Sequence, residues 1–435
     1  TRYSQKDLSR LGVLSASDLL QTLSSAHVNS YGPSGLASPS IRGTGANHTQ
    51  VYWNGLPINS ITLGQSDLTV ITTELSDNVS ISYGSDLSNT SGALGGTIEL
   101  NQAVSWKSSS ILYRQSIGSF GTTGTTVRID ESVGSFHYSV GIVQLSSLND
   151  FKYTDRTLRI PIQKTMENAD FSQLGLVGTI GTKLDRHEIK ISSLITDSER
   201  SLPTIMGVQT KGEKQSDKNV FGVIDYQFIG DKIKNQLKLG YVRLENKYFN
   251  PSIEFESLNF SQMFTIEDDI KVYFNTPWSL SMRIAGRFEY ADSPNYKQQI
   301  KREILSNFSK IERRKENSYH SFSLRTEFID QKGVGLFPGV GGSIKLVKNK
   351  PLHLKWNGSR NFRMPTLNDL YWLPGGNDAL MPETGYCGDI GLSSNLVSNR
   401  KRTNSKIINK LTFQAVSFYS IISNWILWTP NGQNW

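Results

Sequence analysis

The residue types that most often carry chemistry are present in this sequence, but their spacing assembles no reactive site. The six histidines are scattered without the short intervals that gather metal ligands, and no nucleophile elbow occurs. The segment GALGGT lacks the lysine and the helix of a phosphate loop, and SDLSNTSG is too short and too poor in acids for calcium. Unpatterned histidine and serine are usually structural. The sequence therefore predicts no enzyme, no metal site and no cofactor.

Charge is divided unevenly along the chain. Residues 1–102 hold four basic and seven acidic residues, a formal charge of −3. Because the whole chain carries +8, the remaining residues carry +11. Surfaces of opposite sign fix each other's register, which would let an acidic first domain lie inside or against a basic second one. The excess of base is mild and spread over predicted strands, which gives nucleic-acid binding little support. The single cysteine, Cys387, excludes an internal disulfide and a cysteine metal cluster.

Residues 1–102 have the pattern of a small mixed α+β domain. ASDLLQTLSSA has apolar residues at helical spacing, with Ser15 or Ser17 as the N-cap. Further on, Asn54 and Gly55 lie between two short apolar runs. This dipeptide predicts a β-hairpin, because a type I′ turn needs positive φ at both central positions.

From about Trp106 the chain becomes a series of segments of about 10 residues in which apolar and polar side chains alternate. In LSMRIAGRFEY, SFSLRTEF and FHYSVGI, one face is aliphatic or aromatic and the other is polar or charged. We count about fourteen such segments. No apolar run approaches the roughly 18 residues of a membrane-spanning helix.

Alternation alone fits both a soluble sandwich or barrel with a dry core and an outer-membrane barrel with a wet one. Three features favour the membrane barrel: tryptophan and tyrosine near segment ends, arginine and glutamate in mid-strand, and alternating short and long connections. The first residues, TRYSQKDLSRLG, lack the apolar core of a signal peptide. They predict a chain that is either cytoplasmic or already processed. The tryptophan and tyrosine residues near segment ends, which favour the membrane barrel, are Trp106, Tyr273, Trp278, Trp425 and Trp428.

Three motifs within residues 1–102 resemble the plug of the TonB-dependent outer-membrane receptors: SIRGTGANHTQVYWNGLPINS, LGQSDL and DNVSISYGSDLSNTSGALGGTIEL. NFRMPTLNDLYWLPGGNDALMPE, from Asn361 to Glu383, resembles the branch nearest the cobalamin transporters. The resemblance implies an all-β membrane protein, an antiparallel transmembrane β-barrel with the mixed α+β plug in its lumen. Residues 1–102 would be the plug and residues 103–435 the barrel. The family's barrel has about 22 strands, of which this chain would supply about fourteen.

The same resemblance gives several plug residues structural roles. Arg42 would form charge-assisted hydrogen bonds to acids in the plug or on the barrel wall. The hairpin at Asn54 and Gly55 would help to fill the lumen. Gly43, Gly95 and Gly96, with Gly92, would supply the tight backbone where the plug meets the first strand.

Two departures from the family pattern stand out. No TonB-coupling box precedes Thr1, and the final segment, TPNGQNW, has the composition of a turn rather than of a closing strand. An open sheet in lipid leaves backbone groups unpaired at several kcal/mol each. We therefore expect this sequence to be a fragment of a longer polypeptide.

By resemblance, the function is active import of a scarce, bulky ligand across the outer membrane of a Gram-negative bacterium, with plug displacement driven by the TonB complex. Cobalamin is the first expectation, and an iron chelate or another metal complex the next. Gly45 departs from the cobalamin transporters, which carry asparagine there, so it offers only backbone hydrogen bonds. Trp372 fits a ligand contact and a lipid-interface aromatic equally well. The expected ligand-contacting residues are Tyr31, Leu36, Ser38, Gly45, Thr62, Leu63, Tyr371, Trp372 and Asn377.

The alternative function is a receptor-like barrel that serves as a structural or binding subunit of a larger outer-membrane assembly. The expected partners are the TonB complex and outer-membrane lipid, with a surface lipoprotein or other outer-membrane subunits as further candidates. A coupling box in the full gene and uptake that requires the proton gradient would favour transport. A stable complex with other outer-membrane proteins would favour the structural role.

Overall fold

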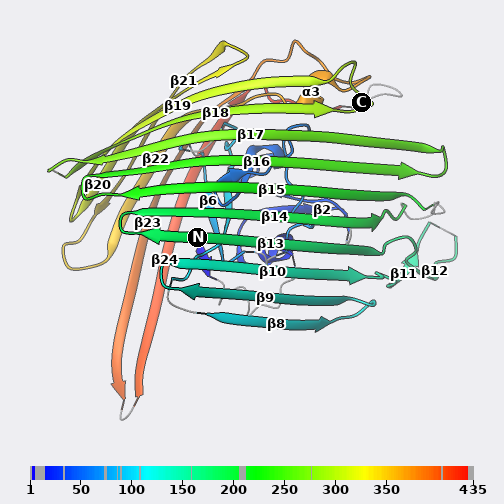
Figure 1. Ribbon diagram of the computed structural model, residues 1–435, viewed down its shortest axis with the longest axis horizontal. Helices are drawn as coiled ribbons and strands as arrows, with labels where there is room; N and C mark the ends of the chain where they lie inside the picture. Colours follow the sequence, from blue (N-terminus) through cyan, green and yellow to red (C-terminus); the bar gives the residue numbers. More distant parts are fainter. Residues whose placement is uncertain are drawn as a thin grey trace.

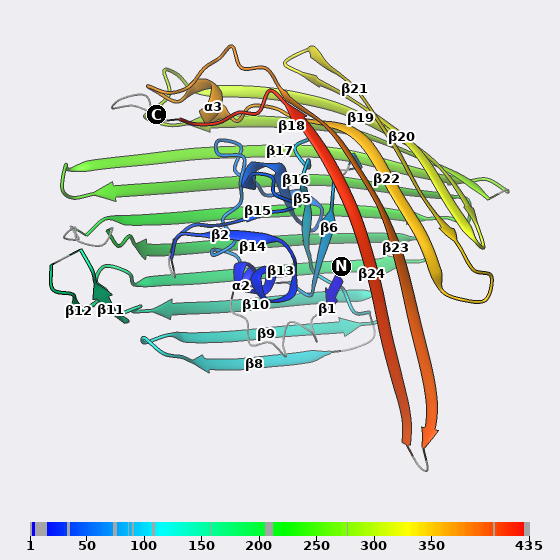
Figure 2. The same cartoon turned by 180° about the vertical axis from the view of Figure 1, so that it is seen from behind.

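Two β-sheets organise the chain in the computed structural model. A five-stranded sheet lies within residues 2–101, and a fifteen-stranded antiparallel sheet begins at Ser110. The large sheet curves around the N-terminal domain (Figures 1 and 2). We call these parts the wall and the plug. The structure describes residues 2–4, 15–32, 35–72, 76–85, 87–88, 91–106, 109–157, 159–204, 212–275, 277–402 and 405–429.

The plug has the mixed α+β architecture that the sequence predicts. Its sheet has the order β1-β6-β7-β4-β5, in which only β4 and β7 are parallel. Ser15 is the N-cap of the helix and forms a capping box with Asp18. The helix ends at Leu23, three residues before the end of the predicted segment, where the Ser24 N–H still reaches the Leu20 carbonyl. The plug elements are β1 (Arg2–Ser4), α2 (Ala16–Leu23), β2 (His27–Ser30), β3 (Ala37–Ser40), η1 (Ala46–His48), β4 (Thr49–Trp53), β5 (Leu56–Pro57), β6 (Asn78–Tyr83) and β7 (Gly96–Asn101).

The hairpin predicted at Asn54 and Gly55 joins β4 to β5. Both residues have positive φ, 50° and 81°, and Trp53 pairs with Leu56 across the turn. The Asn54 side chain accepts a hydrogen bond from the Gln102 N–H at 2.8 Å. The turn is therefore tied to the segment that leaves the plug for the wall.

The wall is a meander in which each strand pairs with its neighbours in sequence, apart from the excursion formed by β11 and β12. At the described residues its two edge strands, β8 and β24, pair only with β9 and β23. Fifteen strands agree with the sequence estimate of about fourteen. The wall strands are β8 (Ser110–Ile117), β9 (Thr123–Val133), β10 (Phe136–Ser147), β13 (Phe171–Leu184), β14 (His187–Ser201), β15 (Lys214–Ile229), β16 (Ile233–Asn250), β17 (Phe255–Tyr273), β18 (Trp278–Asp292), β19 (Ile300–Lys315), β20 (Ser318–Ile329), β21 (Lys332–Lys345), β22 (Leu352–Arg363), β23 (Glu383–Arg402) and β24 (Ser405–Ser423).

Connections of different length lie at the two ends of the wall. Residues 134–135, 185–186 and 316–317 make short turns at one end. At the other end, which we call the long-loop end, residues 148–170, 202–213, 293–299 and 364–382 connect the strands. These longer connections include the hairpin of β11 (Lys152–Asp155) and β12 (Ile162–Thr165) and the helix α3 (Leu367–Tyr371).

The two faces of the wall differ in polarity as the alternation predicts. On β18, Met282, Ile284 and Phe288 are exposed on the outer face, whereas Glu289 is 4% exposed and faces inward. The segments FHYSVGI and SFSLRTEF divide in the same way. Long rows of exposed apolar side chains are characteristic of a surface that meets lipid. The wall therefore has its apolar face outward and its charged face toward the plug.

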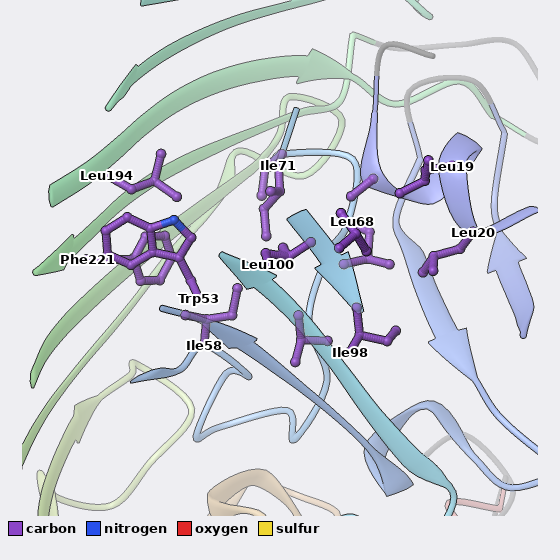
Figure 3. Packing of buried hydrophobic residues seen from close by; sticks show 14 of the residues in the cluster. Leu19, Leu20, Trp53, Ile58, Leu68, Ile71, Ile98, Leu100, Leu194 and Phe221 are labelled. Atoms are coloured by element: carbon purple, nitrogen blue, oxygen red, sulfur yellow. The ribbon is translucent and has the colours of Figure 1, made fainter. Parts of the chain in front are cut away.

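The inner face also carries an apolar patch that the alternation does not reveal. Leu194 of β14 and Phe221 of β15 join the buried cluster centred on Trp53 of the plug. In Figure 3 their side chains point toward Trp53, and the Trp53 and Phe221 ring centroids are 6.4 Å apart. The plug thus shares one hydrophobic core with part of the wall.

No helix among the described residues is both long and apolar enough to cross a bilayer. The segment TPNGQNW, for which the sequence predicted a turn, lies outside the described residues from position 430 onward.

Candidate ligand-binding site

A cavity of about 520 Å³ lies at the long-loop end, between the plug and the wall. Its lining comes from Leu36 and from residues between 58 and 71 of the plug, from β14 to β17, and from three residues of the long loops, Asn295, Asn368 and Trp372. Pockets of roughly 300–1,000 Å³ commonly hold small molecules. We call this the apex cavity.

One asparagine ties both ends of the plug loop below the cavity to β4. The Asn59 side chain accepts from the Val51 N–H at 2.7 Å and donates to the carbonyls of Thr49 and Gly64 at 3.0 Å. These bonds join both ends of the loop to β4. The loop therefore presents Thr62 and Leu63 from a fixed base.

The helix α3 is docked on the same plug loop. The Leu367 and Asn368 N–H groups donate to the Ile61 and Thr62 carbonyls at 3.3 and 3.1 Å, and Thr366 caps the helix through a capping box with Asp369. A long loop of the wall and the plug apex thus form one continuous surface.

Tyr296 orients the side chains that α3 presents to the cavity. Its hydroxyl donates to Asn368 Oδ1 at 2.5 Å, and its ring meets Trp372 edge to face at 6.4 Å. Burial raises the pKa of Tyr296, which keeps the hydroxyl protonated and able to donate. Because the Asn368 oxygen is engaged, its NH₂ group is the end available to a ligand.

A charged contact joins the plug to the wall at the cavity. The buried Arg200 guanidinium lies 2.7 Å from Asp67 of the plug and 2.8 Å from Asp217 of β15, and Asn246 donates to Asp217 at 2.6 Å. Arg200, the single arginine among the described residues of the lining, is therefore shared by two carboxylates. This contact also separates the apex cavity from a second cavity of about 400 Å³ beside α2, which Arg200 also lines.

A buried polar network anchors α3 to the plug and to β23. His48 Nδ1 accepts from the Gly45 N–H at 3.0 Å, so its Nε2 carries the proton and donates to Glu383 at 2.5 Å. Arg363 donates to Glu383 at 2.6 and 2.9 Å, and it reaches Asp369 of α3 at 3.4 Å. The loop that contains α3 is thereby connected to η1 of the plug through ion pairs and hydrogen bonds.

The structure brings together four of the nine ligand-contacting residues expected from the sequence. Leu36, Thr62, Leu63 and Trp372 line the apex cavity, and the other five lie outside its lining. Ser38 is buried within β3, and Tyr31 is 73% exposed. Tyr371 packs against the cluster of Ala291 and Leu367. Gly45 caps η1, and Asn377 is used within its own loop, where its side chain accepts from the Ala379 N–H at 3.0 Å.

The residues given structural roles lie at plug turns and contacts. Arg42 has φ 57°, pairs with Asp389 of β23 at 3.2 Å and lies over the Phe418 ring. Gly43 has φ 73°. An added Cβ would overlap Thr44 Oγ1 at Gly95 and the Ser82 carbonyl at Gly96. A Cβ at Gly55 would lie 2.5 Å from Lys238 Nζ.

Sequence reasoning missed the part of the lining that comes from the wall. Tyr248, Phe255 and Phe260 supply aromatic faces there, and Asn219, Asn246 and Asn259 supply carboxamides. Polar residues on an inward face recur on every strand, so no local signal distinguishes those near the apex. Among the described residues, no group of three or more histidine, cysteine, aspartate or glutamate side chains could hold a metal ion.

Comparison with known proteins agrees with this architecture. Residues 1–97 match the family model "TonB-dependent Receptor Plug Domain". The chain is 22% identical to the vitamin B12 transporter BtuB of Vibrio vulnificus and 21% identical to that of Photobacterium profundum, in each case over 90% of this chain. It spans 64% and 63% of the length of these relatives.

Solved structures match the fold over nearly the whole chain. The FrpB iron transporter from Neisseria meningitidis superposes with a TM-score of 0.77 at 11% identity, over 97% of this chain and 71% of its own. The ferric enterobactin receptor PfeA from Pseudomonas aeruginosa gives 0.76 at 13% identity, over 96% and 71%. At such low identity, these likenesses show the fold alone.

Proposed function

We propose, starting from the plug and barrel fold of the TonB-dependent receptors that this chain has, that it acts in active import across the outer membrane of a Gram-negative bacterium. A bulky ligand binds in the apex cavity, and force delivered by the TonB complex then displaces the plug. No covalent chemistry takes part. In this proposal, residues 1–102 are the plug domain and residues 103–435 belong to the barrel.

The single observation that carries this proposal is the position of the apex cavity. It lies at the long-loop end, and plug residues, loop residues and wall residues all contribute to it. A ligand there contacts the part that must move and the part that stays fixed. Leu36, Thr62, Leu63 and Trp372 are the proposed contacts.

Outside the shared hydrophobic core, the contacts between plug and wall support a displaceable plug. Specific polar contacts join the two parts at Asp67 with Arg200, Asp77 with Arg128, and Arg42 with Asp389. Two of these pair a plug acid with a wall arginine, the arrangement that the opposite formal charges favour. Discrete contacts of this kind can be broken in sequence by a pulling force.

An uptake experiment tests the proposal. The full gene is deleted and restored in its host, and uptake of radiolabelled cyanocobalamin and of a panel of ⁵⁵Fe chelates is measured with and without a protonophore. Transport predicts that uptake of at least one compound falls on deletion, returns on restoration and collapses with the proton gradient. If no compound shows an uptake defect and the protein is recovered in a stable complex with other outer-membrane proteins, the structural alternative replaces transport.

A further inference from the structure

The charges of the apex cavity differ in sign from those of the chain as a whole. Among the described residues, the lining contains one cation, Arg200, and three carboxylates, Asp67, Asp217 and Glu245, which is a formal charge of −2. Arg243, outside the lining, pairs with Glu245 at 3.2 Å, so the net charge of the lining with this partner is −1. Within the described residues, no lysine and no histidine belongs to the lining. The chain as a whole carries +8. The described lining is therefore negative, whereas the chain as a whole is positive.

The one cation of the lining is already neutralised. Arg200 NH2 lies 2.7 Å from Asp67 and 2.8 Å from Asp217, and its NH1 donates to Thr69 at 3.2 Å. These two carboxylates occupy the hydrogen-bonding positions through which the guanidinium would otherwise bind an anion. An incoming anion would have to displace one of them and would still face the other.

The remaining lining suits a ligand that is neutral over most of its surface. Seven carboxamide side chains and five aromatic side chains contribute to it, and the Asn368 NH₂ group is available as a donor. Carboxamides offer both donors and acceptors without charge, and aromatic faces pack against apolar or cationic groups. The carboxamides are Gln65, Gln215, Asn219, Asn246, Asn259, Asn295 and Asn368, and the aromatic residues are Phe221, Tyr248, Phe255, Phe260 and Trp372.

We infer that the apex cavity selects its ligand by charge: it takes a bulky, neutral or cationic molecule rich in amide, hydroxyl or ether groups, and it rejects polyanionic metal chelates. This inference rests on the proposed function, because it assigns the ligand class of the same cavity. The three carboxylates exceed by one the two arginines paired with them. A trianion brought against this lining is repelled by that excess negative charge, in a site with a lower dielectric constant than water. Selection of this kind acts by penalising the wrong ligand.

Equilibrium binding on the purified product of the full gene, in detergent, tests this inference without an energy source, so it is separate from the uptake experiment. The probes are cyanocobalamin, which is neutral, the monocationic ferric complex of a linear trihydroxamate, and a trianionic ferric tris-catecholate. Binding is followed by quenching of tryptophan fluorescence at two salt concentrations. We expect the neutral or the cationic probe to bind at least tenfold more tightly than the trianion, with a smaller gap at high salt.

Two substitutions test the role of the carboxylates. Asp217→Asn removes one charge and leaves Arg200 paired with Asp67, and Glu245→Gln removes another at a half-buried position. Each is expected to tighten trianion binding at least fivefold relative to binding of the neutral probe. Asp197→Asn, in an exposed pair with Lys218, is the matched control and should change neither. Equal or tighter binding of the trianion by the unsubstituted chain overturns the inference, and so does failure of every probe to bind. If cells take up a polyanion and the purified protein also binds the trianion tightly, the transport proposal holds and only the inference of selection by charge is wrong.

Discussion

The pair formed by Asp77 of the plug and Arg128 of β9 is a buried contact through which the wall holds the plug. The two side chains are 6% and 4% exposed, and their two hydrogen bonds are 2.7 and 3.0 Å long. Asp77 also accepts from the Ala103 N–H at 2.8 Å, and Arg128 also pairs with Asp130 at 2.9 Å. Asp77→Asn keeps the shape of the side chain and an acceptor for Ala103, and it removes the charge.

The size of the effect follows from this geometry. Removing one partner of a buried ion pair costs about 3–5 kcal/mol. Because Arg128 keeps Asp130, we expect about 2–3 kcal/mol for Asp77→Asn. Since 1.4 kcal/mol is a factor of ten in an equilibrium, the opened state of the plug becomes about 30- to 150-fold more populated.

Hydrogen exchange followed by mass spectrometry on the purified chain measures this opening. Exchange in β6 and β7 should accelerate by the stated factor in Asp77→Asn. The control is Arg186→Met in the exposed pair with Asp231, where we expect less than about a threefold change, because surface pairs contribute little. The single variant Arg128→Met and the double variant Asp77→Asn with Arg128→Met complete a double-mutant cycle. An acceleration below threefold in Asp77→Asn, or strictly additive effects in the double variant, would refute the reasoning.

Two further predictions concern single positions. Gly95→Ala should destabilise the plug by about 1–3 kcal/mol because the added Cβ overlaps Thr44 Oγ1, whereas Gly222→Ala, with nothing within 4 Å of its Cβ, should be tolerated. Limited trypsin digestion compares the two, and equal digestion rates would contradict the steric argument. Lys164 donates to Asp155 at 2.8 Å and, with further hydrogen bonds, lowers the pKa of Asp155 from 3.8 to about 2. Because this folded pKa lies below the unfolded value, the pair stabilises the β11–β12 hairpin above about pH 4 and ceases to do so as the pH falls toward 2. Intrinsic-rate-corrected exchange across Lys152–Thr165 should rise over that range in the native chain and stay level in Asp155→Asn. A level profile in the native chain would contradict the prediction.

Some features of this protein are determined by local sequence. A period of two assigns each wall residue to one of two faces, because successive side chains of a strand point in opposite directions. The Asn54–Gly55 turn is also determined by local sequence, because it depends on residues that accept positive φ. The strand count and the mixed nature of the plug followed from such short-range rules together with the plug resemblance.

The tertiary structure decided which face is the inside and what meets there. The alternation of Phe136 with His137 is the same for a dry core and for a wet lumen, and the curvature of the wall around the plug decides between the two. The pairing of Asp67 with Arg200 and the packing of Trp53 on Phe221 join residues more than a hundred positions apart.

The wall side of the apex cavity was beyond sequence reasoning for the same physical reason. A strand pattern specifies the direction of a side chain but not its height along the barrel or the partner opposite it. Those depend on strand register and on where the plug lies, which are set by long-range pairing. The sequence therefore determined the elements, their faces and, through the plug resemblance, part of the plug side of the site, whereas the packing of plug against wall determined the wall side.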